Sequence, residues 1–185
     1  MSLERIISLK DSLSFRLTLW YALIFMVSSL LVMFVFYQRV TAKAMKNTDR
    51  DITEEMIEFS EVYKHGGVAG VKQGITLEAS SEGPDEVFFR LVSDKGAIIA
   101  SSDMASWGNI NVSKDLLAQA LDGKKPVFET LKVPGHRYGI RSAYSLIGPS
   151  MALHMGISLK NNEKYSHMFR NLISRLLLPV FLLAA

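Results

Sequence analysis

The sequence predicts an α+β fold, in which an antiparallel sheet of about five strands has long flanking helices and is anchored by two transmembrane helices, the second truncated. Three observations predict it. No charged residue occurs between Leu17 and Tyr37, and a second apolar run begins near Leu172 and is unfinished at Ala185. The polar stretch between these runs, about 130 residues, is long enough for one domain and alternates helical with strand-like patterns.

The first run has the length of a membrane span. A hydrocarbon core about 30 Å thick needs about 20 helical residues. Trp20 and Tyr37 lie near the two ends, where aromatic rings meet the lipid headgroups. A cleaved signal sequence is the alternative, but its apolar part is usually about 7–15 residues long and a small-residue cleavage site follows it. We therefore expect a retained helix.

The proposed organisation has five segments. These are a cytoplasmic tail at 1–16, transmembrane helix 1 at 17–37, a helical stalk at 38–66, a folded domain at 67–170 and the start of transmembrane helix 2 at 171–185. The Lys and Arg residues flanking the first span are balanced, so the positive-inside rule gives no direction. The domain is placed outside the cytoplasm only because a short N-terminal tail and a polar domain between two spans are typical of a receptor with an external domain.

Apolar residues in the stalk recur at helical spacing, at Ile52, Met56, Phe59 and Tyr63. Two uses of this stripe are equally plausible: it docks the helix on the domain, or it forms a dimer seam. Gly66 and Gly67 are expected to stop the helix. A short helix and a loop should follow over 68–83.

The domain begins with a predicted hairpin, formed by 86–92, the turn 93–96 and 97–102. Arg90 should lie opposite the more apolar face of its strand. Ser113 is the N-cap of a helix through about Leu121, which Gly123 stops.

Three further strands are expected at 127–133, 138–147 and 151–159. The last should be half-buried, because Leu153, Met155, Ile157 and Leu159 alternate with smaller or polar residues. A final helix from Asn161 is expected to run into the second span.

Composition and motifs exclude several functions. The chain has no cysteine, so it holds neither a disulfide framework nor a thiolate metal site. The domain is close to neutral, so nucleic acid is not an expected partner. No metalloprotease, nucleophile-elbow or P-loop pattern occurs, and we expect no catalytic residue in this chain.

Two kinds of ligand site are considered. A small anion could be held by Arg90, Arg141 and Lys132 with the hydroxyls of Tyr138, Tyr144 and Ser101. The alternative is that these arginines lie on a solvated sheet face and pair with acids such as Glu129.

A soft metal ion is the second kind of ligand, and it favours imidazole and thioether groups. His136, His154 and Met151 could supply them, as could Met155, His167 and Met168. Adjacent residues such as His154 and Met155 point to opposite faces of a strand, which weakens this hypothesis. A third possibility is a protein partner or a membrane signal without a ligand, with Trp107 as an anchor or as part of the core.

Four segments together resemble the N-terminal half of bacterial sensor histidine kinases, most closely the heavy-metal-sensor type. They are SFRLTLWYALIF, VFFRLVSDKGAIIASS, GKKPVFETLKVPGHRYGIRSAYSL and ISLKNNEKYSHMFRNL. The resemblance implies a PAS-like periplasmic domain between two helices of a multi-pass inner-membrane protein, with the lipid bilayer and a second copy of the chain, in a homodimer, as partners.

The same resemblance implies a kinase core beyond this chain. ATP and magnesium belong to that missing part, which phosphorylates a cognate response regulator; no cofactor is expected in the chain itself. A chemoreceptor or another non-kinase membrane signalling protein is the alternative, and so is a structural protein with two spans. The residues after Ala185 discriminate among them, because a chemoreceptor continues in long heptad helices.

Overall fold

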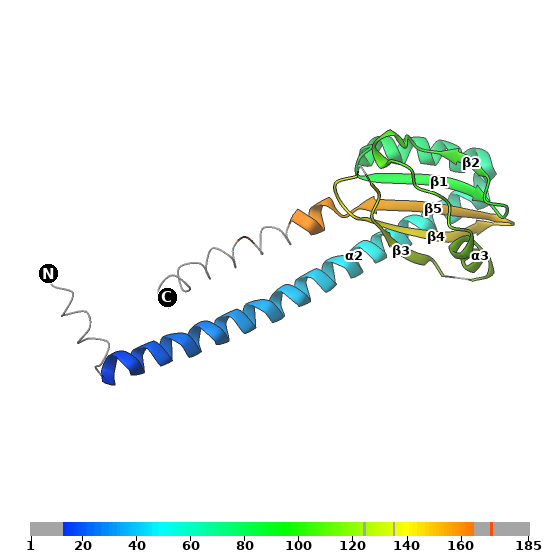
Figure 1. Ribbon diagram of the computed structural model, residues 1–185. Coiled ribbons are helices and arrows are strands. Elements are labelled where there is room, and N and C mark those ends of the chain that lie inside the picture. The colour runs from blue at the N-terminus through cyan, green and yellow to red at the C-terminus, as the bar shows by residue number, and fades with distance from the viewer. Residues whose placement is uncertain (1–12, 124, 135, 165–170, 172–185) are drawn as a thin grey trace. The chain divides into compact units, whose positions relative to one another are not determined.

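The computed structural model describes residues 13–123, 125–134, 136–164 and 171 (Figure 1). It divides into two units, Met1–Lys43 and Ala44–Ala185, which are described separately. The predicted tail at 1–16 lies mostly outside the described residues, and so does all of the second span after residue 171.

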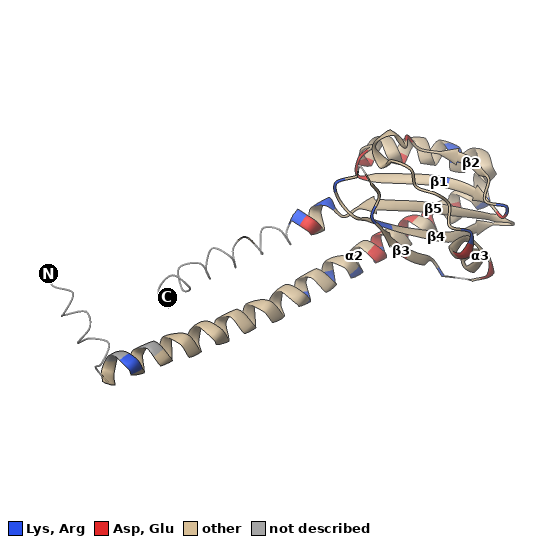
Figure 2. Ribbon diagram, viewed as in Figure 1, with Lys and Arg blue, Asp and Glu red and all other residues tan. Residues whose placement is uncertain are grey.

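Helix α2, Leu13–Glu82, contains the predicted first span. None of the described side chains of its apolar part is buried, and it is the one helix among the described residues that is long and apolar enough to cross a membrane. Figure 2 shows that this part carries no Lys, Arg, Asp or Glu. The predicted retained helix at 17–37 is therefore present as a helix with a lipid-compatible surface.

Gly67 interrupts α2, as the sequence predicts. Its backbone lies at φ 56° and ψ −152°, which glycine adopts without steric cost. The chain then continues as a helix to Glu82, so the helix expected after Gly67 is confirmed, but it is longer than expected and the loop expected within 68–83 is wrong. The reason is packing: Val71 and Ile75, one helical turn apart, are buried and hold the segment helical despite its serines.

The second unit contains one five-stranded antiparallel sheet in the order β2-β1-β5-β4-β3 (Figure 1). The strands are β1 Val87–Ser93, β2 Ile98–Ser101, β3 Val127–Leu131, β4 Ile140–Gly148 and β5 Met151–Ser158. The predicted hairpin and the three later strands are thus confirmed, with ends that differ by one or two residues. The last strand of the sequence lies at the centre of the sheet.

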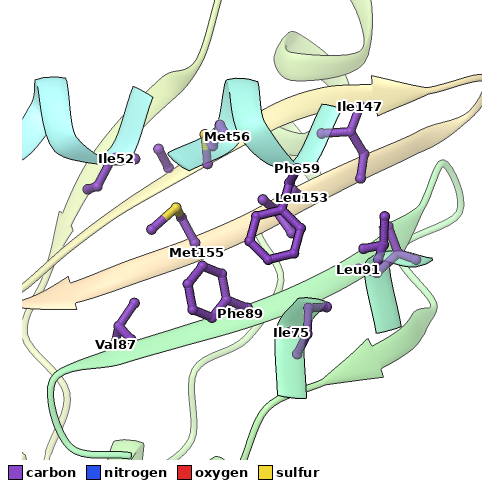
Figure 3. Close-up of a cluster of buried hydrophobic side chains, with 12 residues drawn as sticks. Ile52, Met56, Phe59, Ile75, Val87, Phe89, Leu91, Ile147, Leu153 and Met155 are labelled. Atoms are coloured by element: carbon purple, nitrogen blue, oxygen red, sulfur yellow. The ribbon is translucent and has the colours of Figure 1, made fainter. Parts of the chain in front are cut away.

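One face of the sheet packs against α2 (Figure 3). Ile52, Met56 and Phe59 are buried there among Phe89 and Met155. Tyr63, the fourth residue of the predicted stripe, is partly buried against the same cluster. The docking interpretation of the stripe is therefore confirmed. A dimer seam at these positions would need free surface, and Ile52, Met56 and Phe59 are at most 2 % exposed, so this structure gives that interpretation no support.

The other face is covered as well, by α3 Lys114–Asp122 and by the segment that contains the short helix η1 Ala105–Trp107. The Ser113 side chain accepts a hydrogen bond from Leu116 N, as predicted for an N-cap. β5 is therefore buried on both faces, and the expectation of a half-buried strand is wrong. Trp107 is fully buried, which makes it part of the core.

Glu55 gives the fold a pH dependence. Burial, together with the negative charges of Glu78, Glu58 and Glu82, raises its pKa to about 7. A carboxyl whose pKa is raised by folding stabilises the fold fully below its unfolded pKa, and this contribution is lost as the pH rises through about 7. We expect Glu55→Gln to raise the melting temperature at pH above 7 and to flatten its decline from mildly acidic pH.

Thermal unfolding at several pH values measures this effect. Glu54→Gln is the matched control, since Glu54 is exposed and pairs only with Arg50 in the described structure. It should retain the wild-type pH profile. An unchanged profile in Glu55→Gln would show that Glu55 does not titrate as described.

Candidate functional site

Four polar side chains form a line across the sheet on its α3-covered face, and we call them the Arg90 row. The register pairs Ser101 of β2 with Arg90 of β1, Arg90 with His154 of β5, and His154 with Tyr144 of β4. Directly paired residues of antiparallel strands point to the same face, with their Cβ atoms about 5 Å apart. The row is therefore a contiguous polar strip within a largely apolar layer.

Arg90 is the charged member of the row and is only 5 % exposed. Its Nη1 donates to the carbonyl oxygen of Ile110 at 2.6 Å, and its guanidinium lies 5.5 Å from the Phe88 ring centroid. Nε is buried without a hydrogen-bond partner. Burial lowers the pKa of Arg90 from its ordinary value, although an arginine stays protonated at neutral pH.

His154 and Tyr144 are stacked, with ring centroids 4.0 Å apart. Burial, together with the positive charge of Arg90, lowers the pKa of His154 to about 3. The imidazole is therefore neutral at physiological pH. Its Nε2 lies 3.1 Å from Ser142 Oγ, and its Nδ1 is buried without a partner. The Tyr144 hydroxyl accepts a hydrogen bond from Ser113 N at 3.1 Å.

Ser142 connects His154 to Glu129, which lies 3.3 Å from Ser142 Oγ. Burial raises the pKa of Glu129, while the bond from Ser142 opposes the rise. Serine stands between the two titratable groups, whereas a hydrolytic triad places histidine between serine and the carboxylate. This chain of contacts therefore fixes the imidazole and is not a nucleophilic site.

The structure separates the residues predicted to bind an anion. Arg90 and Tyr144 share the row, but Arg141 lies on the α2 side of the sheet and forms a two-point ion pair with Asp49. Tyr138 is half-buried in the segment before β4. The prediction of one site with both arginines is therefore wrong, because their positions on antiparallel strands face opposite ways. Arg90 is also not on a solvated face, and Glu129 pairs with neither arginine.

The predicted metal ligands are also apart. Met151 packs against the core on the α2 face, whereas His154 lies on the opposite face. His136 stacks on Trp107 at 5.3 Å between ring centroids, and its Nδ1 lies 2.8 Å from the carbonyl oxygen of Tyr138. No group of three His, Asp or Glu residues in the described ranges could hold a metal ion. His167 and Met168 lie outside the described residues.

Sequence reasoning missed a second group of residues, where α2 meets the start of the segment after β5. Asn162 Nδ2 donates to Thr48 Oγ1 at 3.4 Å, and Asp49 beside it holds Arg141. The Glu163 carboxylate accepts a hydrogen bond from Gly139 N at 2.8 Å. The Thr48–Asn162 and Asp49–Arg141 contacts join positions 114 and 92 residues apart, so no local pattern could reveal them. They bring the beginning and the end of the second unit together.

The Arg141–Asp49 pair provides a test of this contact. Its distances are 2.6 and 3.0 Å, and the two side chains are 18 % and 31 % exposed. A charge-assisted, two-point pair of this kind contributes about 1–3 kcal/mol. We expect Arg141→Met to lower the free energy of unfolding by about that amount, and the double variant with Asp49→Asn to show non-additive losses.

Urea unfolding of the single and double variants measures the coupling. Lys160→Met is the matched control, because the Lys160–Glu86 pair lies at the surface and should contribute much less. Purely additive losses at Arg141 and Asp49 would show that the two residues are not energetically coupled.

Comparisons with known proteins give a structural likeness but no sequence match. No protein-family model matches the chain, and no curated protein sequence matches it. Among solved structures, the CusS sensor domain, crystallised with silver bound, is similar at 17 % identity and a TM-score of 0.44. The match covers 69 % of this chain and 99 % of that one. At this similarity no residue role transfers from one protein to the other.

Proposed function

We propose that this chain is the signal-sensing and membrane-anchoring portion of a two-component sensor histidine kinase. In this proposal residues 67–170 lie in the periplasm, two helices anchor the protein in the bacterial inner membrane, and the chain works as a homodimer. A kinase core beyond Ala185 uses ATP and magnesium to phosphorylate a response regulator. The domain would sense a stimulus and the two helices would pass it inward.

The observation that carries the proposal is the double role of α2. The helix contains the candidate span near its beginning and, further along, Ile52, Met56 and Phe59 in the core of the domain. A change in how this core packs therefore acts on the helix that carries the span.

The Thr48–Asn162 contact supports an output through both helices. It links α2 to the segment that follows β5, the segment that is expected to lead into the second span. A stimulus that favours one packing of this contact shifts the balance of two signalling states by its differential affinity for them. A difference of about 1 kcal/mol changes that balance about fivefold.

A chimera tests the proposal. Residues 1–185 replace the sensor half of a characterised sensor kinase, and a transcriptional reporter measures the output. We expect Asn162→Leu and Asp49→Asn to change the basal output, while the exposed control Glu54→Gln leaves it unchanged. If the output also stays constant in Phe59→Ala, which disrupts the core, the domain does not control the kinase and the proposal is wrong.

A further inference from the structure

We infer that the Arg90 row binds the carboxylate of a small organic acid, with Arg90 as the residue that pairs with it. That such an acid is the stimulus of the protein rests on the proposed sensor function; the binding site itself does not.

The first step is the unpaired charge of Arg90. A buried guanidinium is costly unless an anion or a full set of acceptors compensates it. Among the described residues, Arg90 forms no ion pair and its only hydrogen bond is from Nη1 to Ile110 O. The other arginine of the sheet, Arg141, has a two-point carboxylate partner in Asp49. Arg90 is therefore as buried as an arginine in an ion pair, but no carboxylate of the described residues pairs with it.

The second step is the geometry of the free donors. Because Nη1 is occupied, the edge of the guanidinium formed by Nε and Nη2 remains, and neither atom donates to a described residue. This edge presents two parallel N–H groups, which match the two oxygens of a carboxylate. The two N–H groups of this edge therefore favour a planar carboxylate over an acceptor that offers a single oxygen.

The third step is that the domain has no acid of its own in place for this edge. Glu129 shares the face but lies on β3, three strands from β1, which is about 14 Å at the usual strand spacing. In the covering segment, Asp103 accepts a hydrogen bond from Ala105 N, and Asp115 is exposed in the first turn of α3. An external carboxylate would meet no competitor from these groups.

The neighbours of Arg90 complete a site for a singly charged acid. His154 presents the buried, unpartnered Nδ1 beside it, and the Tyr144 hydroxyl has a proton that it can donate. The imidazole is neutral, so the row carries one positive charge, which matches a carboxylate better than a phosphate dianion. Ser101, at the β2 end, is the one exposed member of the row.

Thermal unfolding of the full chain in detergent tests the inference. The probes are sodium acetate, lactate and pyruvate, and inorganic phosphate, each compared with sodium chloride at equal ionic strength. We expect at least one organic acid to raise the melting temperature; at ten times its dissociation constant, the unfolding equilibrium constant falls about elevenfold. Phosphate should have no larger effect than chloride.

Variants identify the residue responsible. Arg90→Met should abolish the shift and Arg90→Lys should weaken it, whereas Arg141→Met should retain it in full, since Arg141 faces the other side of the sheet. The inference is overturned if no organic acid exceeds chloride, if phosphate acts equally well, or if a stably folded Arg90→Met keeps the shift.

A spectroscopic measurement on the wild-type chain keeps the test independent of variant folding. The Nε–H resonance of Arg90, assigned by its loss in Arg90→Lys, should move on titration with the stabilising acid, and an unmoved resonance contradicts the site. The melting-temperature and resonance measurements need no kinase. If they show no acid binding, the ligand site is wrong and the proposed sensor role still stands. If they show binding but the chimera gives no change in output, the sensor role is wrong and the ligand site still stands.

Discussion

Replacement of Phe59 by alanine is expected to lower the free energy of unfolding of the domain by about 3–5 kcal/mol. Phe59 is 2 % exposed and lies 5.2 Å, between ring centroids, from Phe89 of β1 (Figure 3). Truncation to alanine removes this contact and leaves a cavity between α2 and the sheet. A loss of this size is a large part of the stability of a single domain.

Urea unfolding of the full chain in detergent, followed by near-ultraviolet circular dichroism, measures the loss. Ile57→Ala is the matched control: Ile57 lies on the same helix two residues away but is 59 % exposed. It should change the free energy of unfolding by no more than about 0.5 kcal/mol. Equal effects of the two substitutions would contradict the docking of α2 on the sheet.

Replacement of Trp107 by alanine is expected to cost about 3–5 kcal/mol. The indole is fully buried, packs edge-on against Phe88 at 5.0 Å and stacks on His136. Its Nε1 also donates to the carbonyl oxygen of Pro84 at 2.7 Å. The substitution therefore detaches the covering segment from the sheet on the side of the Arg90 row.

Two further variants separate the contribution of ring packing from that of the Nε1 hydrogen bond and from effects of the neighbouring position. Trp107→Phe keeps most of the ring packing and loses the hydrogen bond, so its loss should be clearly smaller than that of Trp107→Ala. Ser106→Ala, at the exposed neighbouring position, should leave the unfolding midpoint near that of the wild type. If Trp107→Ala unfolds at the wild-type urea concentration, the segment does not hold this face closed.

The secondary structure could be predicted because each element carries a local signal. The Ser113 cap, the stripe from Ile52 to Phe59 and the alternating pattern of the strands depend on neighbours in the sequence. The segment over 68–83 shows the limit of such signals. Its serines favour a turn, but burial of Val71 and Ile75 decides the conformation, and burial depends on the tertiary fold.

The site could be predicted only in part. Arg90 and Tyr144 are chosen for their chemistry, and the alternation of β1 correctly places Arg90 away from the α2 face. Arg141 and Tyr144 lie three residues apart on β4, so strand alternation alone puts them on opposite faces, and this signal is present in the sequence. Which of the two shares the face of Arg90 follows from the register of β4 and β1 with β5. The pairing of Arg141 with Asp49, 92 residues away, has no sequence signal, and neither has the Thr48–Asn162 contact.

The most direct test of the central claim is the side of the membrane on which the domain folds. The chain has no cysteine, so a single Asp94→Cys, in the exposed turn between β1 and β2, can be labelled with a membrane-impermeant maleimide. Labelling of intact bacterial spheroplasts should equal labelling after lysis, since the domain is expected outside the cytoplasm. Labelling that appears only after lysis would place the domain inside and contradict the account.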